Sequence, residues 1–181
     1  GEADRPYLET DVPNPQGVYG QTKLAGELAI QKVNPPGSII IRTSWVYSSF
    51  GSNFVKTMLR LGKEKGELNV VGDQVASPTY ARDLALAILV ITPQLNNKYV
   101  GVYHYSNAGF CSWFDFAKEI FSIGKVMCKV NSITTAEYPT LAKRPQYSVF
   151  DKSKITRDFG VKPPVWSDSL AQCMSLHNLM N

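Results

Sequence analysis

The sequence contains little of what secreted, zinc-binding or membrane-spanning proteins are built from. Its 181 residues include only three cysteines and two histidines. Cys111, Cys128 and Cys173 are odd in number and far apart, which excludes a disulfide framework and the ligand spacing of a zinc site. The apolar run ARDLALAILVIT is too short to span a bilayer and predicts a buried helix. No secretion signal is visible, so we expect a cytoplasmic protein without a membrane partner.

Long blocks of one charge are also missing. Lys and Arg together number 19 against 15 Asp and Glu, which gives a net charge of +4. The basic residues are scattered, and their densest cluster, KEKGE, is interrupted by acidic residues, so no nucleic-acid partner is expected. Hydrophobic residues make up 44% of the chain and charged residues 19%. This composition is typical of a soluble globular protein of about one domain.

What is present is an alternation of helical and strand-like segments. Apolar residues at helical spacing predict helices over residues 15–33, 54–66, 80–91, 112–124, 151–160 and 166–180. Strands are predicted at residues 39–41, 68–72, 101–107 and 129–134. The run Ile39–Ile41 has no polar alternation, which is typical of a parallel strand buried on both faces. The alternation predicts an α/β fold.

A glycine-rich phosphate-binding turn is absent from the sequence. A doubly wound nucleotide-binding domain normally starts with a strand and a G-x-G-x-x-G turn that holds a pyrophosphate. Gly17, Gly20 and Gly26 lie in a helical pattern with no strand before them. The chain begins GEADRPYLETD, without a methionine or an apolar strand, and so reads as a protein entered partway through.

The first predicted helix carries Tyr19 and Lys23 beside its apolar face. Residues four apart lie on one face of a helix, so the phenol and the ammonium are expected to be close. A tyrosine phenol ordinarily has a pKa of about 10, and an ammonium within about 6 Å favours its ionised form. The spacing alone is far more often structural than catalytic.

The wider context of this helix resembles one enzyme family. The blocks NPQGVYGQTKLAGE, IIIRTSWVYS, GSNFVKTMLRL, VVGDQVASPTYARDLA, GVYHYSNAG and KRPQYSVFDKSKI closely resemble, in order, the dTDP-4-dehydrorhamnose reductases, which are extended short-chain dehydrogenases/reductases. The resemblance implies the C-terminal part of a Rossmann-like doubly wound parallel sheet with a smaller α/β substrate-binding region. Residues 1–66 would belong to the nucleotide-binding domain. Residues 67–181 would be mainly substrate-binding, with about 80–107 returning to the Rossmann core.

The resemblance also implies an activity. Such enzymes reduce dTDP-4-dehydro-L-rhamnose to dTDP-L-rhamnose with NADPH or NADH, in the biosynthesis of cell-surface polysaccharide. Tyr19 would donate the proton, Lys23 would hydrogen-bond the nicotinamide ribose, and both would contact the cofactor together with Thr43. The first half of the Rossmann domain would precede this chain, so residues 1–181 alone are expected to be inactive. A homodimer and Mg²⁺ are further expectations that rest on the resemblance.

Six residues are candidates for binding the dTDP-sugar by the same resemblance. They are Trp45, Asn53, Gln74, Pro78, Thr79 and Arg144. All but Gln74 have a structural alternative: a core tryptophan, a helix cap at Asn53, a helix start at Ser77–Thr79 and a surface arginine. The guanidinium of Arg144 suits a diphosphate, since its fork matches phosphate oxygens.

Two more residues are expected to be structural. Arg42 more plausibly forms an ion pair than binds a ligand, and His104 is expected to be a core histidine whose hydrogen bonds are satisfied.

Two other functions stay open. A nucleotide-sugar epimerase or dehydratase of the same superfamily would share most of these features, although the RTSWVYS and DQVASPT blocks favour the reductase. A non-catalytic subunit resembling the regulatory subunit of methionine adenosyltransferase is the second alternative. The presence of both Tyr19 and Lys23 argues against it.

Overall fold

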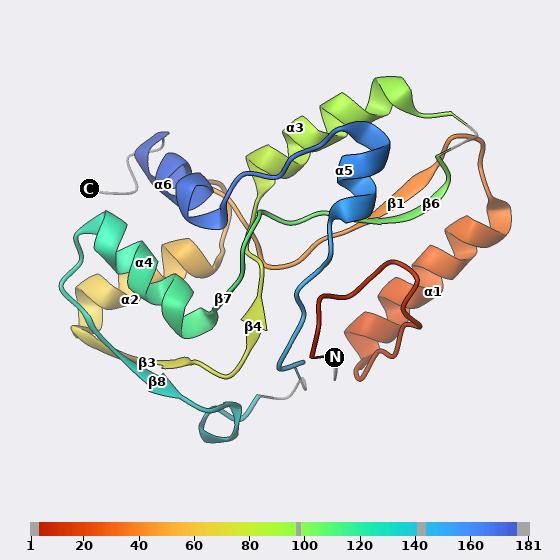
Figure 1. The fold of residues 1–181 in the computed structure, drawn as a ribbon. Helices are drawn as coiled ribbons and strands as arrows, with labels where there is room; N and C mark the ends of the chain where they lie inside the picture. The colour runs from red at the N-terminus through yellow and green to blue at the C-terminus, as the bar shows by residue number, and fades with distance from the viewer. Residues whose placement is uncertain (1–3, 97–98, 141–143, 177–181) are drawn as a thin grey trace.

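Helices and strands alternate along the chain, as the sequence predicts, in a computed structural model that describes residues 4–96, 99–140 and 144–176 (Figure 1). The helices are α1 (Val18–Val33), α2 (Phe54–Lys65), α3 (Ala81–Ile91), α4 (Trp113–Gly124), α5 (Ser153–Phe159) and α6 (Trp166–Leu176), with short 3₁₀ turns η1 (Thr92–Gln94) and η2 (Thr135–Glu137). The strands are β1 (Ile39–Arg42), β2 (Val46–Tyr47), β3 (Glu67–Val71), β4 (Val75–Ala76), β5 (Thr79–Tyr80), β6 (Gly101–His104), β7 (Cys111–Ser112) and β8 (Lys129–Ile133).

The strands pair two by two, mostly in parallel. Pairs β1–β6, β2–β5 and β3–β8 are parallel, and β4–β7 is antiparallel. Parallel partners need a long crossover, and each of these pairs is separated in sequence by at least one helix. The α/β class with parallel strands is therefore confirmed.

The first core surrounds the β1–β6 pair. On one face of the pair, Ile39, Ile41 and Tyr103 pack with residues of α3 and α5. Successive strand residues point to opposite faces, and Arg42 accordingly reaches Glu27 of α1 on the other side. Figure 1 shows α1 on one side of the two strands and α5 on the other.

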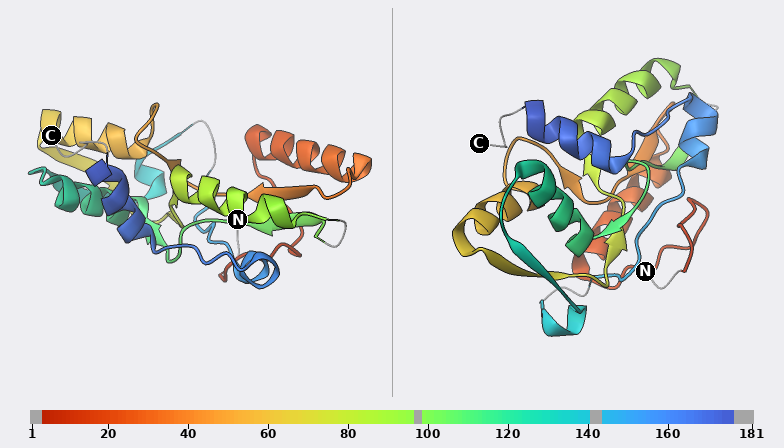
Figure 2. Two further views of the ribbon diagram at one scale, coloured as in Figure 1. Left: turned by 90° about the horizontal axis from the view of Figure 1, so that it is seen from above. Right: turned by 60° about the vertical axis from the view of Figure 1, so that its left-hand side comes forward.

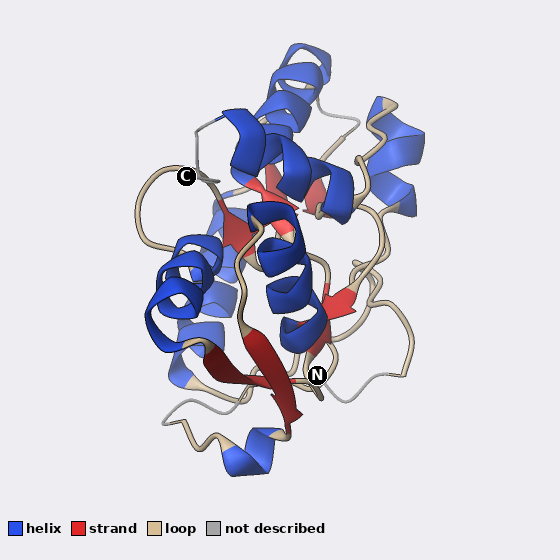
Figure 3. Ribbon diagram, turned by 90° about the vertical axis from the view of Figure 1, so that its left-hand side faces the viewer, coloured by secondary structure: helices blue, strands red, loops and turns tan. Residues whose placement is uncertain are grey.

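The second core lies beside the first when the molecule is seen from above (Figure 2). It is built from α2, α4 and α6 against β3 and β8, with Val55, Phe116, Ile120 and Leu170 all almost completely buried. The turn η2 lies just beyond the end of the β3–β8 pair (Figure 3). A Cβ at Gly62 of α2 would lie 2.6 Å from Cε1 of Phe121, so glycine at this position lets α2 and α4 approach closely.

The apolar face predicted for α1 is left uncovered in the described structure. None of the side chains of α1 is buried, and Val18 and Val33 are each 75% exposed. Within the described residues β1 pairs with β6 alone, and its four residues are only half-buried. The predicted parallel pairing of this strand is confirmed, but the predicted full burial is wrong for this chain, because only one of the two edges of β1 has a partner strand among the described residues.

Four short strands were not predicted. Strands β2, β4, β5 and β7 have two residues each, too few to show a period of two. Thr79 and Tyr80 pair with β2, so α3 starts at Ala81. The alternative of a helix start at Ser77–Thr79 is wrong for this reason. No helix in the described part of the chain is long and apolar enough to cross a membrane.

Candidate active site

Tyr19 and Lys23 lie one above the other at the start of α1. Lys23 Nζ is 5.4 Å from the centroid of the Tyr19 ring, as the spacing predicts. The Tyr19 side chain is 77% exposed, and Lys23 is exposed as well. The helix begins after Gly17. Glycine at position 20 lets its first turn pack closely on Pro15, since a Cβ there would lie 2.9 Å from Cβ of Pro15. The phenol and the ammonium therefore both point into open space, where a ligand can reach them.

The segment that follows β1 is tied to the segment before α3. Thr43 Oγ1 donates to Thr79 Oγ1 at 3.1 Å, and Ser44 Oγ donates to the carbonyl oxygen of Ser77 at 2.7 Å. The backbone N–H of Thr79 donates to the carbonyl oxygen of Trp45 at 3.1 Å. The two predicted blocks RTSW and ASPT thus meet at the carboxyl end of β1, the edge at which α/β proteins bind ligands.

Within this junction, Thr79 and Pro78 are buried. The structure brings them next to Thr43 but covers them, so their contribution to a binding site runs through the backbone and the shape of the segment.

Trp45 lies at the edge of the second core. Its indole is half-buried and stacks on the indole of Trp113, with ring centroids 3.5 Å apart and planes inclined by 14°. Its backbone is in the left-handed region, with φ of 44°. Sequence reasoning missed Trp113. The available signal was its position directly after Ser112, a residue type that caps helices and that forms a capping box with Asp115 at the start of α4.

A pocket of about 430 Å³ brings Gln74 and Arg144 together. Its aromatic wall is formed by Phe54, Trp113 and Tyr138. Gln74 is 6% exposed, and its Nε2 donates to Thr135 Oγ1 at 3.0 Å, which orients the side chain. Arg144 is exposed at the rim. Aromatic rings beside an exposed guanidinium suit a ligand with a planar ring and an anionic group.

Asn53 has the structural role given above as its alternative, and Arg42 has the structural role expected for it. Asn53 Oδ1 accepts from the N–H of Lys56 at 3.2 Å and caps α2, while its Nδ2 donates to the carbonyl oxygen of Ser48 at 2.6 Å. Arg42 forms an ion pair with Glu27 at 2.6 Å. This ion pair fixes α1, and therefore Tyr19 and Lys23, against the end of β1.

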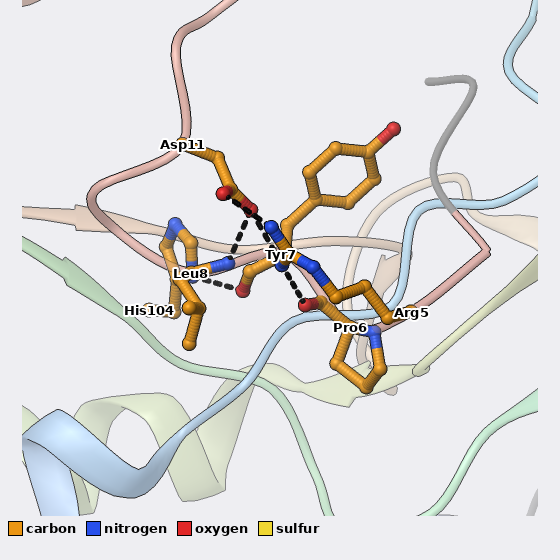
Figure 4. A network of polar contacts seen from close by, with 6 residues as sticks. All are labelled: Arg5, Pro6, Tyr7, Leu8, Asp11 and His104. Carbon is orange, nitrogen blue, oxygen red and sulfur yellow. Dashed lines mark hydrogen bonds and ion pairs between the residues drawn. The ribbon is translucent and has the colours of Figure 1, made fainter.

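His104 is buried, as predicted, but only one of its ring nitrogens has a partner. Nδ1 lies 3.1 Å from the carbonyl oxygen of Tyr7 (Figure 4), and because a carbonyl only accepts, Nδ1 is the donor. Nε2 is buried without a hydrogen-bond partner. The ring stacks on Phe150 at 4.3 Å, and the backbone N–H of His104 donates to Glu9 Oε1 at 3.0 Å. The expectation of a fully satisfied histidine is wrong, because the Tyr7 carbonyl can serve only one nitrogen.

Acidification is expected to destabilise the folded protein through His104. Burial lowers the pKa of His104 below its ordinary value near 6.5, while Glu9 opposes the shift and Arg42 adds to it. Below that ordinary value the unfolded chain binds a proton that the folded chain resists. The free energy of unfolding should therefore fall as the pH drops from about 6.5, by at most about 1.4 kcal/mol per pH unit, until the folded ring is also protonated.

Urea unfolding at a series of pH values, with wild type and His104→Gln compared, measures this contribution. The variant should lose less stability on acidification than wild type. The only other histidine, His177, lies outside the described residues, and His177→Gln serves as the matched control. Equal acid sensitivity of wild type and His104→Gln would contradict the prediction.

The described residues contain no group of three or more His, Cys, Asp or Glu side chains that could hold a metal ion. Residues 4–96, 99–140 and 144–176 therefore offer no such cluster for the Mg²⁺ that the resemblance implies.

The parallel strand pairs joined through helices place the described residues in the Rossmann-like class of α/β proteins. Residues 1–178 match the family described as RmlD substrate binding domain. The chain belongs to this family.

Individual relatives agree with the family match. The chain is 45% identical over 174 residues to a dTDP-4-dehydrorhamnose reductase of Aggregatibacter actinomycetemcomitans, covering 91% of this chain and 58% of that protein. It is similar to the crystal structure of a dTDP-4-dehydrorhamnose reductase ortholog from Clostridium acetobutylicum, with a TM-score of 0.92, 43% identity and coverage of 98% of this chain and 62% of that one. The Bacillus anthracis enzyme in complex with NADP matches with a TM-score of 0.87 and 42% identity, covering 96% and 61%. The chain thus spans less than two thirds of each of these relatives.

Proposed function

We propose that this chain supplies the proton donor and the sugar-nucleotide site of a reductase that converts dTDP-4-dehydro-L-rhamnose to dTDP-L-rhamnose. The observation that carries the proposal is the exposed pair Tyr19 and Lys23, held by the Arg42–Glu27 ion pair at the same edge of the fold as Trp45. The names of the relatives support the same reaction.

Reduction of the C4 ketone requires a hydride at carbon and a proton at oxygen. A nicotinamide, when bound, supplies the hydride. The hydroxyl of Tyr19 gives its proton to the carbonyl oxygen, which becomes the C4 hydroxyl group. The Lys23 ammonium, 5.4 Å from the phenol ring, stabilises the tyrosinate that remains.

Lys23 and Thr43 fit the ribose side of a nicotinamide cofactor. The Lys23 ammonium is an exposed donor, and the Thr43 hydroxyl lies at the carboxyl end of β1. A glycine-rich turn for the pyrophosphate does not occur in the 181 residues. We assign NADPH or NADH to the full-length protein, and the NADP bound in the Bacillus anthracis relative supports this class of cofactor.

The pocket beside Trp113 is proposed to take the nucleotide end of the substrate. Its aromatic wall suits the thymine base, and Arg144 at the rim suits the diphosphate. The sugar would then extend toward Trp45. The division at residue 66 into nucleotide-binding and substrate-binding parts stays a prediction. Helix α2 precedes this boundary in the sequence, and its side chains belong to the second core. We also propose a homodimer, which rests on the resemblance of the sequence to the reductase family alone.

The test of this function is consumption of NADPH by the full-length protein with dTDP-4-dehydro-L-rhamnose, together with identification of dTDP-L-rhamnose as the product. Absence of turnover, with the folded protein still binding dTDP, would refute the proposed reaction.

Arg144→Ala is expected to raise KM for the dTDP-sugar by about tenfold or more while kcat changes little, because a diphosphate contact exists in both the ground and the transition state. Steady-state kinetics and dTDP calorimetry on the full-length protein measure both effects. Arg60→Ala is the matched control, since Arg60 is exposed on α2 and pairs with Glu64 one helical turn away. Equal dTDP affinity of wild type and Arg144→Ala would remove Arg144 from the site.

A further inference from the structure

We infer that Trp113 is a positioning residue that holds the indole of Trp45 in its working orientation, between the nucleotide pocket and the carboxyl end of β1. The inference rests on the proposed function, since Trp45 matters for the reaction only if the sugar of the substrate packs against it.

The stack between the two indoles is close and nearly parallel. The ring centroids are 3.5 Å apart and the planes are inclined by 14°. Trp113 is the first residue of α4, and its backbone is fixed by the capping box of the preceding residue. Ser112 Oγ accepts from the N–H of Asp115 at 3.0 Å, and Asp115 Oδ2 accepts from the N–H of Ser112 at 3.1 Å. The start of α4 therefore determines where the Trp113 ring lies.

The backbone of Trp45 is held in a conformation that a bulky side chain rarely adopts. Its φ of 44° lies in the left-handed region. Such strain persists only where the surroundings fix it, and it concentrates at functional sites. Here the carbonyl oxygen of Trp45 accepts from Thr79, and the adjacent Ser44 donates to Ser77. Backbone and ring are thus constrained by different contacts. The segment before α3 holds the backbone, while the ring packs on Trp113 and, at 6.5 Å between ring centroids, on Phe116.

Trp113 also belongs to the wall of the pocket. It lines the pocket with Phe54, whose ring centroid is 4.5 Å from its own. The described residues that line the pocket include Trp113 but not Trp45. A ligand in the pocket therefore touches the ring that supports Trp45, and one side chain links the two halves of the proposed sugar-nucleotide site.

Circular dichroism of the full-length protein tests the stack directly, since two stacked indoles give an exciton couplet in the far ultraviolet. The couplet should be present in wild type and lost in both Trp45→Phe and Trp113→Phe. Trp166→Phe is the matched control, because Trp166 lies edge-on to Phe116 at 5.7 Å and takes no part in the stack. A couplet that persists in Trp113→Phe would overturn the inference. Should Trp113→Phe not fold, Trp113→Tyr takes its place, with unfolding temperatures measured for every variant.

Kinetics separate positioning from a merely structural role. Trp113→Phe should lower kcat/KM for the keto sugar by about tenfold or more, because small misplacements of a positioning group are costly. Affinity for dTDP alone should change less than about twofold, since phenylalanine keeps the pocket wall aromatic. The double variant Trp45→Phe/Trp113→Phe should be no worse than Trp45→Phe, because the first change already removes what the second supports.

The outcomes divide cleanly. Additive losses in the double variant, or an unchanged kcat/KM in Trp113→Phe, would overturn the positioning role. Wild type that binds dTDP but does not reduce the keto sugar would refute the proposed function instead, and the couplet then decides by itself whether Trp113 orients Trp45.

Discussion

Replacing Tyr19 by phenylalanine in the full-length protein is expected to lower kcat by about 100- to 10,000-fold, the usual contribution of a general acid. The phenol is the group that the structure offers to a ligand at the start of α1, with Lys23 Nζ 5.4 Å from its ring. Removal of one oxygen from a side chain that is 77% exposed should not affect folding or dTDP-sugar binding. Steady-state kinetics and calorimetry measure the two quantities separately.

Tyr99→Phe is the matched control for this substitution. Tyr99 packs on Phe159 in the first core, near the start of β6 and away from the proposed site. The control should retain wild-type kcat. If Tyr19→Phe kept more than about a third of wild-type kcat, far above the loss expected for a general acid, Tyr19 would not be the proton donor.

Residues 1–181 alone are expected to bind NADPH with a Kd above about 10 μM and to show no reductase activity. Dinucleotide affinity in this fold depends on backbone N–H groups of a glycine-rich turn at a helix N-terminus, and the sequence contains no such turn. A single hydrogen bond to a charged donor contributes about 1.5–3 kcal/mol, whereas micromolar affinity requires about 8 kcal/mol.

Titration of the purified chain, followed through nicotinamide fluorescence, measures this affinity, and the full-length protein is the control. A saturable signal with Kd below about 10 μM would mean that these residues hold a complete cofactor site. The proposal that these residues lack the pyrophosphate-binding part of the cofactor site would then be wrong.

Sequence periodicity predicted α2 and α4 well because these helices are amphipathic. The buried helix predicted from ARDLALAILVIT is wrong, because Leu86, Ile88, Leu89 and Val90 of α3 face away from the core and are 43–68% exposed. The start of α4 follows from the cap at Ser112. The end of α2 before β3 follows from Gly66, which takes the left-handed conformation there. The two-residue strands could not be predicted, since β2 and β5 exist only because the chain brings Val46 and Thr79 together. Local pattern carries no information on such a distant pairing.

The candidate site divides in the same way. The proximity of Tyr19 and Lys23 follows from helical geometry, so the sequence was sufficient to predict it. The stack of Trp45 on Trp113 joins residues far apart in the sequence, and only the packing of α4 against the end of β1 reveals it. The unpaired Nε2 of His104 is equally invisible in sequence, because it depends on which carbonyl the first residues of the chain present.

The close approach at Gly62 has a consequence for molecular recognition. Helix α2 carries Phe54 and Leu61 of the pocket lining, and α4 carries Trp113, whose ring is in contact with that of Phe54. The contact of Gly62 with Phe121 sets the spacing of these helices, although neither residue lines the pocket. The placement of Phe54 relative to Trp113, and with it the shape of the aromatic wall, is therefore a property of the helix pair. A larger side chain at position 62 would reshape the pocket without replacing any residue that lines it.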